Sequence, residues 1–279
     1  MSDARVLIVG CGDLGIATAT RLQQAGLTVA GARRTAGALP AAITALAADI
    51  TRPASLTTLA EFKPDILLYA VASNGRDDAA YQASYVDGLR NTLAALQTVP
   101  LRHALFVSST RVYGESDGGW CDEQGDPAPA EFGGERLWQA EQVLQQAACA
   151  TTALRLSGIY GPGRNRLLTL ATEPARWPAD NRWTNRIHRD DAAAFIAYLI
   201  HKISNGDAVE RCYNVSDDMP APQHDVLHWL AARQGLDVRQ QAKPEVAGGK
   251  RIRNTRLHDS GFTLGYSSYQ QGYGALLND

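Results

Sequence analysis

The first apolar run of the chain ends in a glycine-rich turn, which limits the fold more than any other feature. The run covers residues 6–9, and the turn reads Gly10-Cys11-Gly12-Asp13-Leu14-Gly15 before a helical pattern begins. In this spacing the first glycine permits a tight turn, the second lets a pyrophosphate approach the backbone, and the third allows close helix–strand packing. A helix that starts here offers backbone N–H groups to phosphates. We therefore predict a dinucleotide site formed by Gly10, Gly12, Asp13, Leu14 and Gly15.

Short apolar runs alternate with amphipathic patterns along most of the chain. The runs lie at residues 6–9, 27–30, 65–71, 104–108, 152–156 and 212–215, and the helical patterns lie at 14–25, 81–96, 135–148 and 192–203. Mostly continuous apolar strands are typical of parallel sheets buried on both faces. Strands that alternate with helices indicate βαβ units, so we predict an α/β fold with a doubly wound parallel sheet. Asp190 and Asp191 are expected to cap the last of these helices.

Two regions interrupt this alternation. Residues 161–185 are rich in Pro, Gly, Arg and Trp, and the tail beyond residue 216 carries one helical pattern and a Tyr- and Gly-rich end. A length of 279 residues suits one large domain with a small addition. We expect residues 1–160 and 186–216 to form the nucleotide-binding domain, and residues 161–185 and 217–279 to form a small C-terminal cap.

Composition excludes several other classes of protein. Hydrophobic residues make up 45% and charged residues 20%, and the net charge of −2 gives no overall attraction to nucleic acid or an anionic membrane. The four cysteines and six histidines lack the spacing of metal ligands, so no metal site is predicted. No apolar run is long enough to span a membrane, and the run at 6–9 is too short for a signal-peptide core. We expect a reduced, cytoplasmic protein.

The end of the second predicted strand distinguishes between two cofactors. An NAD site usually places an acid about 20 residues beyond the glycines to bind the ribose 2′-hydroxyl, yet no acid lies between Asp13 and Asp49. The strand ends instead in Arg33 and Arg34. Guanidinium groups suit a 2′-phosphate, which they can bind through two parallel hydrogen bonds. We therefore predict NADP(H), with NAD(H) as the alternative.

Four further motifs follow the glycine turn along the chain. They are Phe106–Gly114 (FVSSTRVYG), Leu154–Gly163 (LRLSGIYGPG), Arg186–Asp191 (RIHRDD) and Tyr213–Val215 (YNV). Together they resemble the extended or atypical branch of the short-chain dehydrogenase/reductase superfamily, the NAD-dependent epimerase/dehydratase family. The resemblance implies a Rossmann-type sheet with a C-terminal substrate-binding cap, and a homodimer that pairs the helices at 81–96 and 135–148. It also implies cofactor contacts from Asp49, Ile50, Ala70, Val71, Ala72, Ser108, Ser157, Gly158 and Ile159.

The catalytic motif of that family is altered in this chain. The family uses a Ser or Thr together with Tyr-x-x-x-Lys, and the matching places here hold Phe132 and Arg136. Phenylalanine cannot transfer a proton, and arginine does not replace lysine chemically. The remaining catalytic candidates are Ser109, Tyr113 as a substitute proton donor, and Arg136 as a ligand of the nicotinamide ribose. Thr110-Arg111 stands where dehydratases of the family carry an acid pair, which disfavours dehydration by that route.

Arginine dominates the basic residues, since only four of the 27 are lysine. Arginine mixed with tryptophan suits an anionic, partly planar ligand such as a nucleotide diphosphate. The candidate substrate residues are Arg164, Arg182, Arg186 and Arg251. We predict an NAD(P)-dependent oxidoreductase or epimerase acting on a hydroxyl or carbonyl carbon of a small molecule, with a nucleotide sugar as the candidate. Two alternatives stay open, a reductase that works without a protein acid–base and a non-catalytic NADP(H) sensor or scaffold.

Overall fold

The computed structural model describes residues 4–35, 37, 39–114 and 117–278. The chain divides into two compact units. The first comprises Met1–Val112, Pro129–Arg155 and Ala193–Tyr213, and the second comprises Tyr113–Ala128, Leu156–Ala192 and Asn214–Asp279. Beyond the residues expected in the cap, the second unit therefore also includes 113–128, 156–160, 186–192 and 214–216.

A seven-stranded sheet with the order β11-β7-β5-β4-β1-β2-β3 forms the centre of the fold. Its strands are β1 (Arg5–Val9), β2 (Thr28–Arg33), β3 (Thr44–Ala47), β4 (Ile66–Tyr69), β5 (His103–Ser109), β7 (Ala150–Leu156) and β11 (Cys212–Val215). The pairs β1–β2, β1–β4, β2–β3 and β4–β5 are all parallel. The strand order turns back at β1, as in a doubly wound sheet. The predicted α/β fold of Rossmann type is confirmed.

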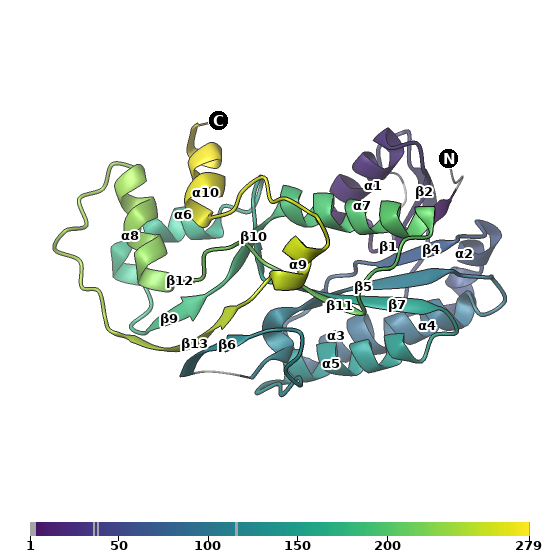
Figure 1. The fold of residues 1–279 in the computed structure, drawn as a ribbon, viewed down its shortest axis with the longest axis horizontal. Coiled ribbons are helices and arrows are strands. Elements are labelled where there is room, and N and C mark those ends of the chain that lie inside the picture. The colour runs from purple at the N-terminus through teal and green to yellow at the C-terminus, as the bar shows by residue number, and fades with distance from the viewer. Residues whose placement is uncertain (1–3, 36, 38, 115–116, 279) are drawn as a thin grey trace. The chain divides into compact units, whose positions relative to one another are not determined.

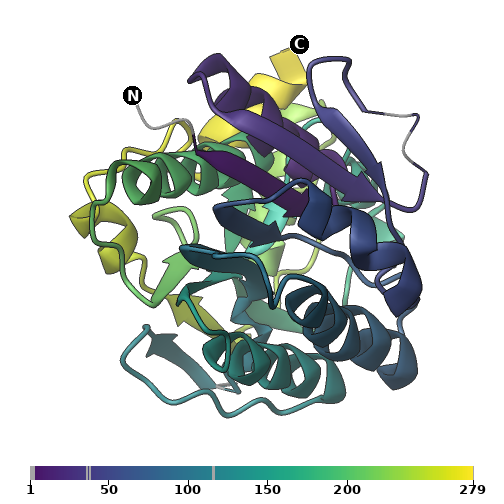
Figure 2. The same ribbon diagram turned by 90° about the vertical axis from the view of Figure 1, so that its right-hand side faces the viewer.

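Helices cover both faces of this sheet. Figures 1 and 2 show α1 (Asp13–Gln24) and the first unit's part of α7 (Arg189–Asn205) on one face. On the other face α4 (Gly88–Ala95) and α5 (Phe132–Gln145) lie side by side. The shorter elements are η2 (Pro53–Leu56), α2 (Thr57–Glu61), α3 (Asp78–Tyr81), η3 (Gln82–Asp87) and η4 (Thr110–Val112). The segment η3 is π-helical and joins α3 to α4, which the sequence pattern did not predict.

The apolar strands bury both faces, as their continuous runs require. Side chains of β1 from Val6 to Val9 and all of β4 are fully or almost fully buried. By contrast, β3 is largely exposed at the edge of the sheet, and its apolar residues are mostly small alanines. This exposure explains why β3 was missing from the strands predicted by hydrophobicity.

The second unit is built around two small sheets. One has the order β12-β9-β13-β6, and the other pairs β10 with β8. Their strands are β6 (Asp117–Cys121), β8 (Gly158–Tyr160), β9 (Asn181–Thr184), β10 (Arg186–His188), β12 (Ala221–Pro222) and β13 (Val246–Ile252). The helical elements are α6 (Arg166–Ala171), η5 (Pro174–Arg176), α8 (Gln223–Arg233), α9 (Thr255–Asp259) and α10 (Tyr269–Asn278). The core of this unit includes Tyr160, Trp177, Leu227, Leu230 and Tyr273.

The start of α7 differs from the prediction. The helix begins at Arg189, so Asp190 and Asp191 lie in its first turn and neither is the N-cap residue. The buried Asp191 carboxylate instead accepts the backbone N–H groups of Gly265 and Tyr266, both at 2.8 Å. The Asp191 carboxylate therefore binds the N–H groups of a distant loop instead of capping its own helix. No helix of the described residues is both long and apolar enough to cross a membrane.

Candidate cofactor and active site

The glycine turn lies at the carboxyl end of β1, in close contact with the loop after β4. Gly10 has φ of +85°, and a Cβ atom built on it would lie 2.5 Å from the backbone nitrogen of Val71. The N–H groups of Gly10 and Cys11 both donate to the Ala32 carbonyl, at 3.0 and 3.2 Å. This turn therefore requires glycine at its first position for both conformation and space.

The second glycine leaves the space over the turn open. A Cβ atom on Gly12 would meet nothing nearer than the Gly10 carbonyl oxygen at 4.0 Å, and both Gly12 and Asp13 are exposed. The N-cap residue of α1 is Gly12, which has no side chain to cap the helix. Leu14 and Gly15 are buried and anchor the helix against the sheet. An uncapped helix start beside an open glycine fits the pyrophosphate of a dinucleotide.

The two arginines at the end of β2 differ in exposure. Arg33 is half-buried, and Arg34 is exposed and donates from Nη2 to Asn74 Oδ1, 3.0 Å away in the segment after β4. This contact holds one guanidinium beside the region where the strands β1, β2 and β4 end. The sequence placed both residues at this strand end, and the structure agrees with that placement.

The carboxylate of Asp49, which follows β3, forms hydrogen bonds with a residue close to it in sequence. Asp49 Oδ1 accepts from the Thr51 hydroxyl at 2.7 Å and the Thr51 N–H at 3.0 Å. These hydrogen bonds, with smaller contributions from the charges of Arg52 and Arg34, lower the pKa of the Asp49 carboxyl. The next residue, Ile50, accepts from the Asn91 side chain through its carbonyl at 2.9 Å. Asp49 is therefore an ionised acceptor at this edge of the sheet.

The residues after β4 meet a tyrosine that sequence reasoning missed. Ala70, Val71 and Ala72 follow the strand, and the N–H of Ser73 donates to the Tyr85 hydroxyl at 3.3 Å. Tyr85 lies in the π-helical segment η3, and burial raises the pKa of its phenol. The helical pattern at 81–96 placed this residue on a helix but could not show which way its ring pointed.

The two serines at the end of β5 have different surroundings. Ser108 is buried and donates to Glu141 Oε1 at 2.6 Å, and the same carboxylate forms a buried ion pair with Arg155. Ser109 is half-buried, and its Oγ accepts from the Arg111 N–H at 3.3 Å. Of the two serines, Ser109 is the one whose hydroxyl is not enclosed in a buried network.

The altered catalytic positions lie at the start of α5. Phe132 is the first residue of the helix, and its ring packs edge-on to Tyr81 with centroids 5.4 Å apart. Arg136, one turn later, donates to both carboxylate oxygens of Asp78 at 2.7 and 2.8 Å, and to Gln139 at 2.8 Å. The guanidinium expected to hold a ribose therefore already forms a bidentate ion pair.

Arg111 is a second cation at this place, and the sequence did not single it out as a site residue. Its guanidinium binds both carboxylate oxygens of Glu131 at 3.0 and 2.7 Å and donates to the Tyr81 hydroxyl at 2.7 Å. Glu131 also caps α5 by accepting the N–H groups of Gly133 and Gly134. A Cβ atom on Gly133 would lie 2.7 Å from Arg111 Nη2. The glycine pair at the helix start was the only sequence signal of this close approach.

In the second unit, Tyr113 is buried, with 2% of its surface exposed. Its hydroxyl donates to Asn214 Oδ1 at 2.9 Å, and its carbonyl accepts from the Lys250 ammonium. The Tyr113 phenol already donates its proton to a buried amide oxygen. The geometry therefore does not favour the proton-donor role that was expected from the sequence. Ser157 is buried, whereas Gly158 is exposed and Ile159 is half-buried on β8.

The four candidate substrate arginines have unlike surroundings. Arg182 is exposed and pairs with Asp180 at 3.0 Å, and Arg164 is half-buried. Arg251 lies over the rings of Trp120 and Trp183, at 4.9 and 5.0 Å from their centroids. Arg186 is buried and donates to the Thr184 hydroxyl at 2.7 Å. The arginine–tryptophan mixture predicted from the sequence is therefore realised at Arg251.

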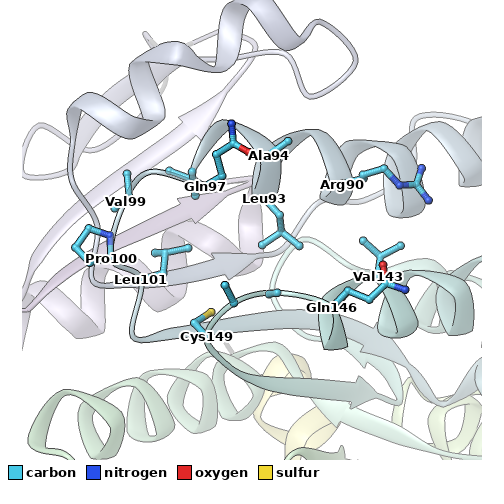
Figure 3. A pocket seen from close by; sticks show the side chains of 13 residues that line it. Arg90, Leu93, Ala94, Gln97, Val99, Pro100, Leu101, Val143, Gln146 and Cys149 are labelled. Carbon is cyan, nitrogen blue, oxygen red and sulfur yellow. The ribbon is translucent and has the colours of Figure 1, made fainter.

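A separate pocket of about 550 Å³ lies in the first unit between α4 and α5, away from the glycine turn. Figure 3 shows Leu93, Val99, Pro100, Val143 and Cys149 around it, with Arg90 at one end. Most of these lining side chains are apolar. Among the described residues, no group of three His, Cys, Asp or Glu side chains could hold a metal ion, and none of the four cysteines forms a disulfide.

Comparison with known proteins places this geometry in context. A family model for the NAD dependent epimerase/dehydratase family matches residues 6–216. Over 172 residues the chain is 34% identical to N-acetyl-alpha-D-glucosaminyl-diphospho-ditrans,octacis-undecaprenol 4-epimerase of Escherichia coli O157:H7; the match covers 57% of this chain and 51% of that protein. The chain thus spans about half the length of that curated relative.

Solved structures match over almost the whole chain. A protein from Methylobacillus flagellatus, provisionally described as an NAD-dependent epimerase/dehydratase, is 50% identical with a TM-score of 0.90, covering 99% of this chain and 98% of that one. The Bordetella bronchiseptica enzyme WbmG, solved in complex with NAD and UDP, has a TM-score of 0.81 at 18% identity and covers 99% and 94% of the two chains. At that identity the second likeness supports the fold alone.

Proposed function

We propose that this chain, which belongs to the NAD dependent epimerase/dehydratase family, binds a nicotinamide dinucleotide and oxidises or epimerises a hydroxyl-bearing carbon of a nucleotide sugar. The observation that carries the proposal is the glycine turn. Gly10 touches the loop after β4, while Gly12 leaves open space beside the uncapped start of α1. When bound, the nicotinamide group supplies hydride chemistry that no side chain can supply.

In this proposal, different residues of the chain bind different parts of the dinucleotide. The backbone at Gly12, Asp13 and Leu14 binds the phosphates, and the loop after β4 supports the rest of the cofactor. The ionised Asp49 accepts a hydrogen bond from the adenine amine. The remaining proposed contacts come from Ile50, Ala70, Val71, Ala72, Ser108, Ser157, Gly158 and Ile159. Ser108 contributes through its backbone, since its hydroxyl donates to Glu141.

The proposal includes a preference for NADP(H) over NAD(H). Arg33 and Arg34 end β2, and the stretch between Asp13 and Asp49 contains no carboxylate that would repel a 2′-phosphate. Asn74 holds Arg34 in place, which reduces the conformational entropy lost when an anion binds. Dissociation constants for NADP⁺ and NAD⁺, measured by calorimetry at the same ionic strength, test this. Equal constants, or a smaller one for NAD⁺, contradict the preference.

Two observations support a sugar diphosphate as substrate, and a nucleotide sugar is the proposed member of that class. A curated relative at 34% identity is named N-acetyl-alpha-D-glucosaminyl-diphospho-ditrans,octacis-undecaprenol 4-epimerase, a name that includes a sugar diphosphate. In this chain Arg251 offers a guanidinium held against two tryptophan rings, which suits a charged, planar ligand. We assign substrate contacts to Arg164, Arg182 and Arg251, and a buried supporting position to Arg186.

Interconversion of nucleotide-sugar epimers is the direct test of the proposed activity. The protein is incubated with NAD⁺ or NADP⁺ and, in turn, UDP-glucose, UDP-galactose and UDP-N-acetylglucosamine, and the products are separated by chromatography. Appearance of the 4-epimer, or of reduced nicotinamide with a keto sugar, supports the proposal. Tight dinucleotide binding without any turnover across this set favours the second candidate, a non-catalytic NADP(H) sensor or scaffold. The replacement of the family's Tyr and Lys by Phe132 and Arg136 is the observation in its favour.

The proposal further includes a cytoplasmic homodimer. None of the four cysteines forms a disulfide, which suits a reducing compartment. The apolar pocket between α4 and α5 lies on the two helices from which the sequence predicted subunit pairing. A partner copy that buries this face would remove its apolar side chains from water.

A further inference from the structure

We propose that Tyr81 transfers the substrate proton in this enzyme and that Arg111 positions its hydroxyl. The pair replaces the tyrosine and lysine that the family motif has lost at Phe132 and Arg136. This inference rests on the proposed function, because a proton-transfer residue has a role only if a hydroxyl or carbonyl carbon reacts.

The first step of the argument is the direction of one hydrogen bond. Arg111 Nη1 donates to the Tyr81 hydroxyl oxygen at 2.7 Å, and a guanidinium has no acceptor. The phenol proton must therefore point elsewhere, and within the described part of the chain no hydrogen bond uses it. Tyr81 is half-buried, and its hydrogen bond with Arg111 lies in exposed surroundings. Tyr81 is thus a fixed donor whose proton remains available.

The second step is that Arg111 is held firmly. Glu131 binds its guanidinium through two oxygens and at the same time caps α5, so the carboxylate is itself anchored. The absence of a side chain at Gly133 leaves room for the guanidinium, since a Cβ atom there would lie 2.7 Å from it. Its hydrogen bonds and ion pair with Glu131 outweigh burial and raise the pKa of Arg111, which stays cationic. A fixed cation beside a phenol is the arrangement that the lost lysine gave the family motif.

The third step is the position of Tyr81 in the fold. Its ring packs against the ring of Phe132, with 5.4 Å between the two centroids. Tyr81 is therefore a direct neighbour of the position at which the family motif has its tyrosine. Tyr81 is the last residue of α3, and the π-helical segment η3 follows it. Such segments appear frequently at functional sites. The other tyrosine of this cluster, Tyr85, accepts from the neutral Ser73 N–H rather than from a cation, and burial raises the pKa of its phenol.

The proton step balances without any further reactant. During reduction, a carbonyl carbon takes a hydride, which the dinucleotide of the proposed function supplies, and its oxygen takes the proton of Tyr81. The O–H bond of Tyr81 breaks, the O–H bond of the substrate forms, and the electron pair stays on a phenolate that Arg111 still binds. Water returns the proton afterwards. In the oxidation direction the phenolate takes the substrate's hydroxyl proton.

The test compares Tyr81→Phe with wild type and with Tyr198→Phe on α7 as the matched control. Tyr81→Phe keeps the ring that packs on Phe132 and removes only the hydroxyl. Enzyme in excess is mixed with cofactor and UDP-glucose or UDP-galactose, and nicotinamide absorbance follows a single turnover. Calorimetry with NADP⁺ and with UDP reports binding separately. General acid–base catalysis typically contributes about 10²–10⁴-fold, so we expect a rate loss of that size with unchanged affinities. Tyr198→Phe keeps the wild-type rate.

The outcomes separate this inference from the proposed function. If wild type turns over and Tyr81→Phe does so at the same rate, the role of Tyr81 is overturned and the proposed function stands. If wild type never turns over, the proposed function fails, and the role of Tyr81 fails with it. If Tyr81→Phe loses cofactor binding through misfolding, Arg111→Gln decides: a wild-type rate overturns the pairing, and a rate loss with normal NADP⁺ affinity supports it.

Discussion

Arg155 and Glu141 form an ion pair inside the first unit, with 2.8 Å between Nη2 and Oε2 and side chains that are 6% and 1% exposed. Ser108 donates to the same carboxylate at 2.6 Å. The pair links β7 to α5, the helix that carries the altered catalytic positions. Because both charges are out of water, each depends on the other for compensation.

Removing one charge of this pair should strongly destabilise the protein. Glu141→Gln leaves the buried Arg155 guanidinium without a counter-charge, and breaking such a pair typically costs about 3–5 kcal/mol. Urea unfolding followed by circular dichroism measures the loss. The control is Glu61→Gln, an exposed residue at the end of α2, which should change the stability little. Equal stabilities for the two variants would show that the pair contributes nothing.

The two glycines of the turn should respond differently to alanine. At Gly10 alanine meets the Val71 backbone and a φ of +85°, so Gly10→Ala should lower stability by about 1–3 kcal/mol, the usual range for backbone strain. At Gly12 the space is open, so Gly12→Ala should keep the melting temperature but weaken NADP⁺ binding. Thermal unfolding and calorimetry on both variants check this. Unchanged dinucleotide affinity in Gly12→Ala would contradict the placement of the pyrophosphate.

Arg34 should contribute more to NADP⁺ affinity than to NAD⁺ affinity. A hydrogen bond to a charged group contributes about 1.5–3 kcal/mol, so Arg34→Ala should weaken NADP⁺ binding roughly ten- to a hundredfold. NAD⁺, which lacks the 2′-phosphate, should be much less affected. Arg239→Ala, at an exposed arginine that pairs with Asp237, is the control. If Arg34→Ala weakens both dinucleotides equally, its guanidinium does not recognise the 2′-phosphate.

Stability should decrease as the pH falls through the range set by His103. Burial lowers the pKa of this imidazole from 6.5 to about 4, while its Nε2 lies 2.9 Å from the Thr152 hydroxyl. Between those two pH values the unfolded chain binds a proton that the folded protein does not, so the free energy of unfolding falls as the pH falls. Chemical denaturation across this range measures the slope. His103→Gln should flatten it, and an identical slope in that variant would assign the effect to other groups.

A charge on the α4–α5 face should prevent the proposed dimer. Leu93→Asp places a carboxylate in the apolar pocket, where a partner copy would have to desolvate it. Light scattering should give a dimer mass for wild type and a monomer mass for the variant. Val246→Asp, at an exposed apolar residue of the second unit, is the control and should remain dimeric. A monomeric wild type would refute the homodimer.

The central sheet could be predicted because its strands are buried on both faces and so read as continuous apolar runs. The same reasoning missed β3, whose side chains are largely exposed, and β13, which contains Gly248 and Gly249 and shifts its register against β6 and β9. Neither strand has the periodicity that hydrophobic patterns detect. The glycine turn was predictable in full, since its chemistry depends on consecutive residues.

The candidate proton site was harder to predict for a physical reason. Tyr81, Arg111 and Glu131 come from three separate segments, and each alone resembles an ordinary surface residue. Their contacts depend on side-chain directions at the end of α3, in the short helical turn after β5 and at the N-cap of α5, and sequence periodicity does not encode these. Tyr113 was the better candidate by sequence because it adjoins β5, yet its hydroxyl lies buried against Asn214.

The packing of Arg111 against Gly133 ties the first turn of α5 to the segment after β5. A side chain at position 133 would displace the guanidinium, and that displacement would release Glu131, which also caps α5. The arginine, its carboxylate and the glycine therefore depend on one another, and a substitution at any one of them disturbs both the cation beside Tyr81 and the cap of α5.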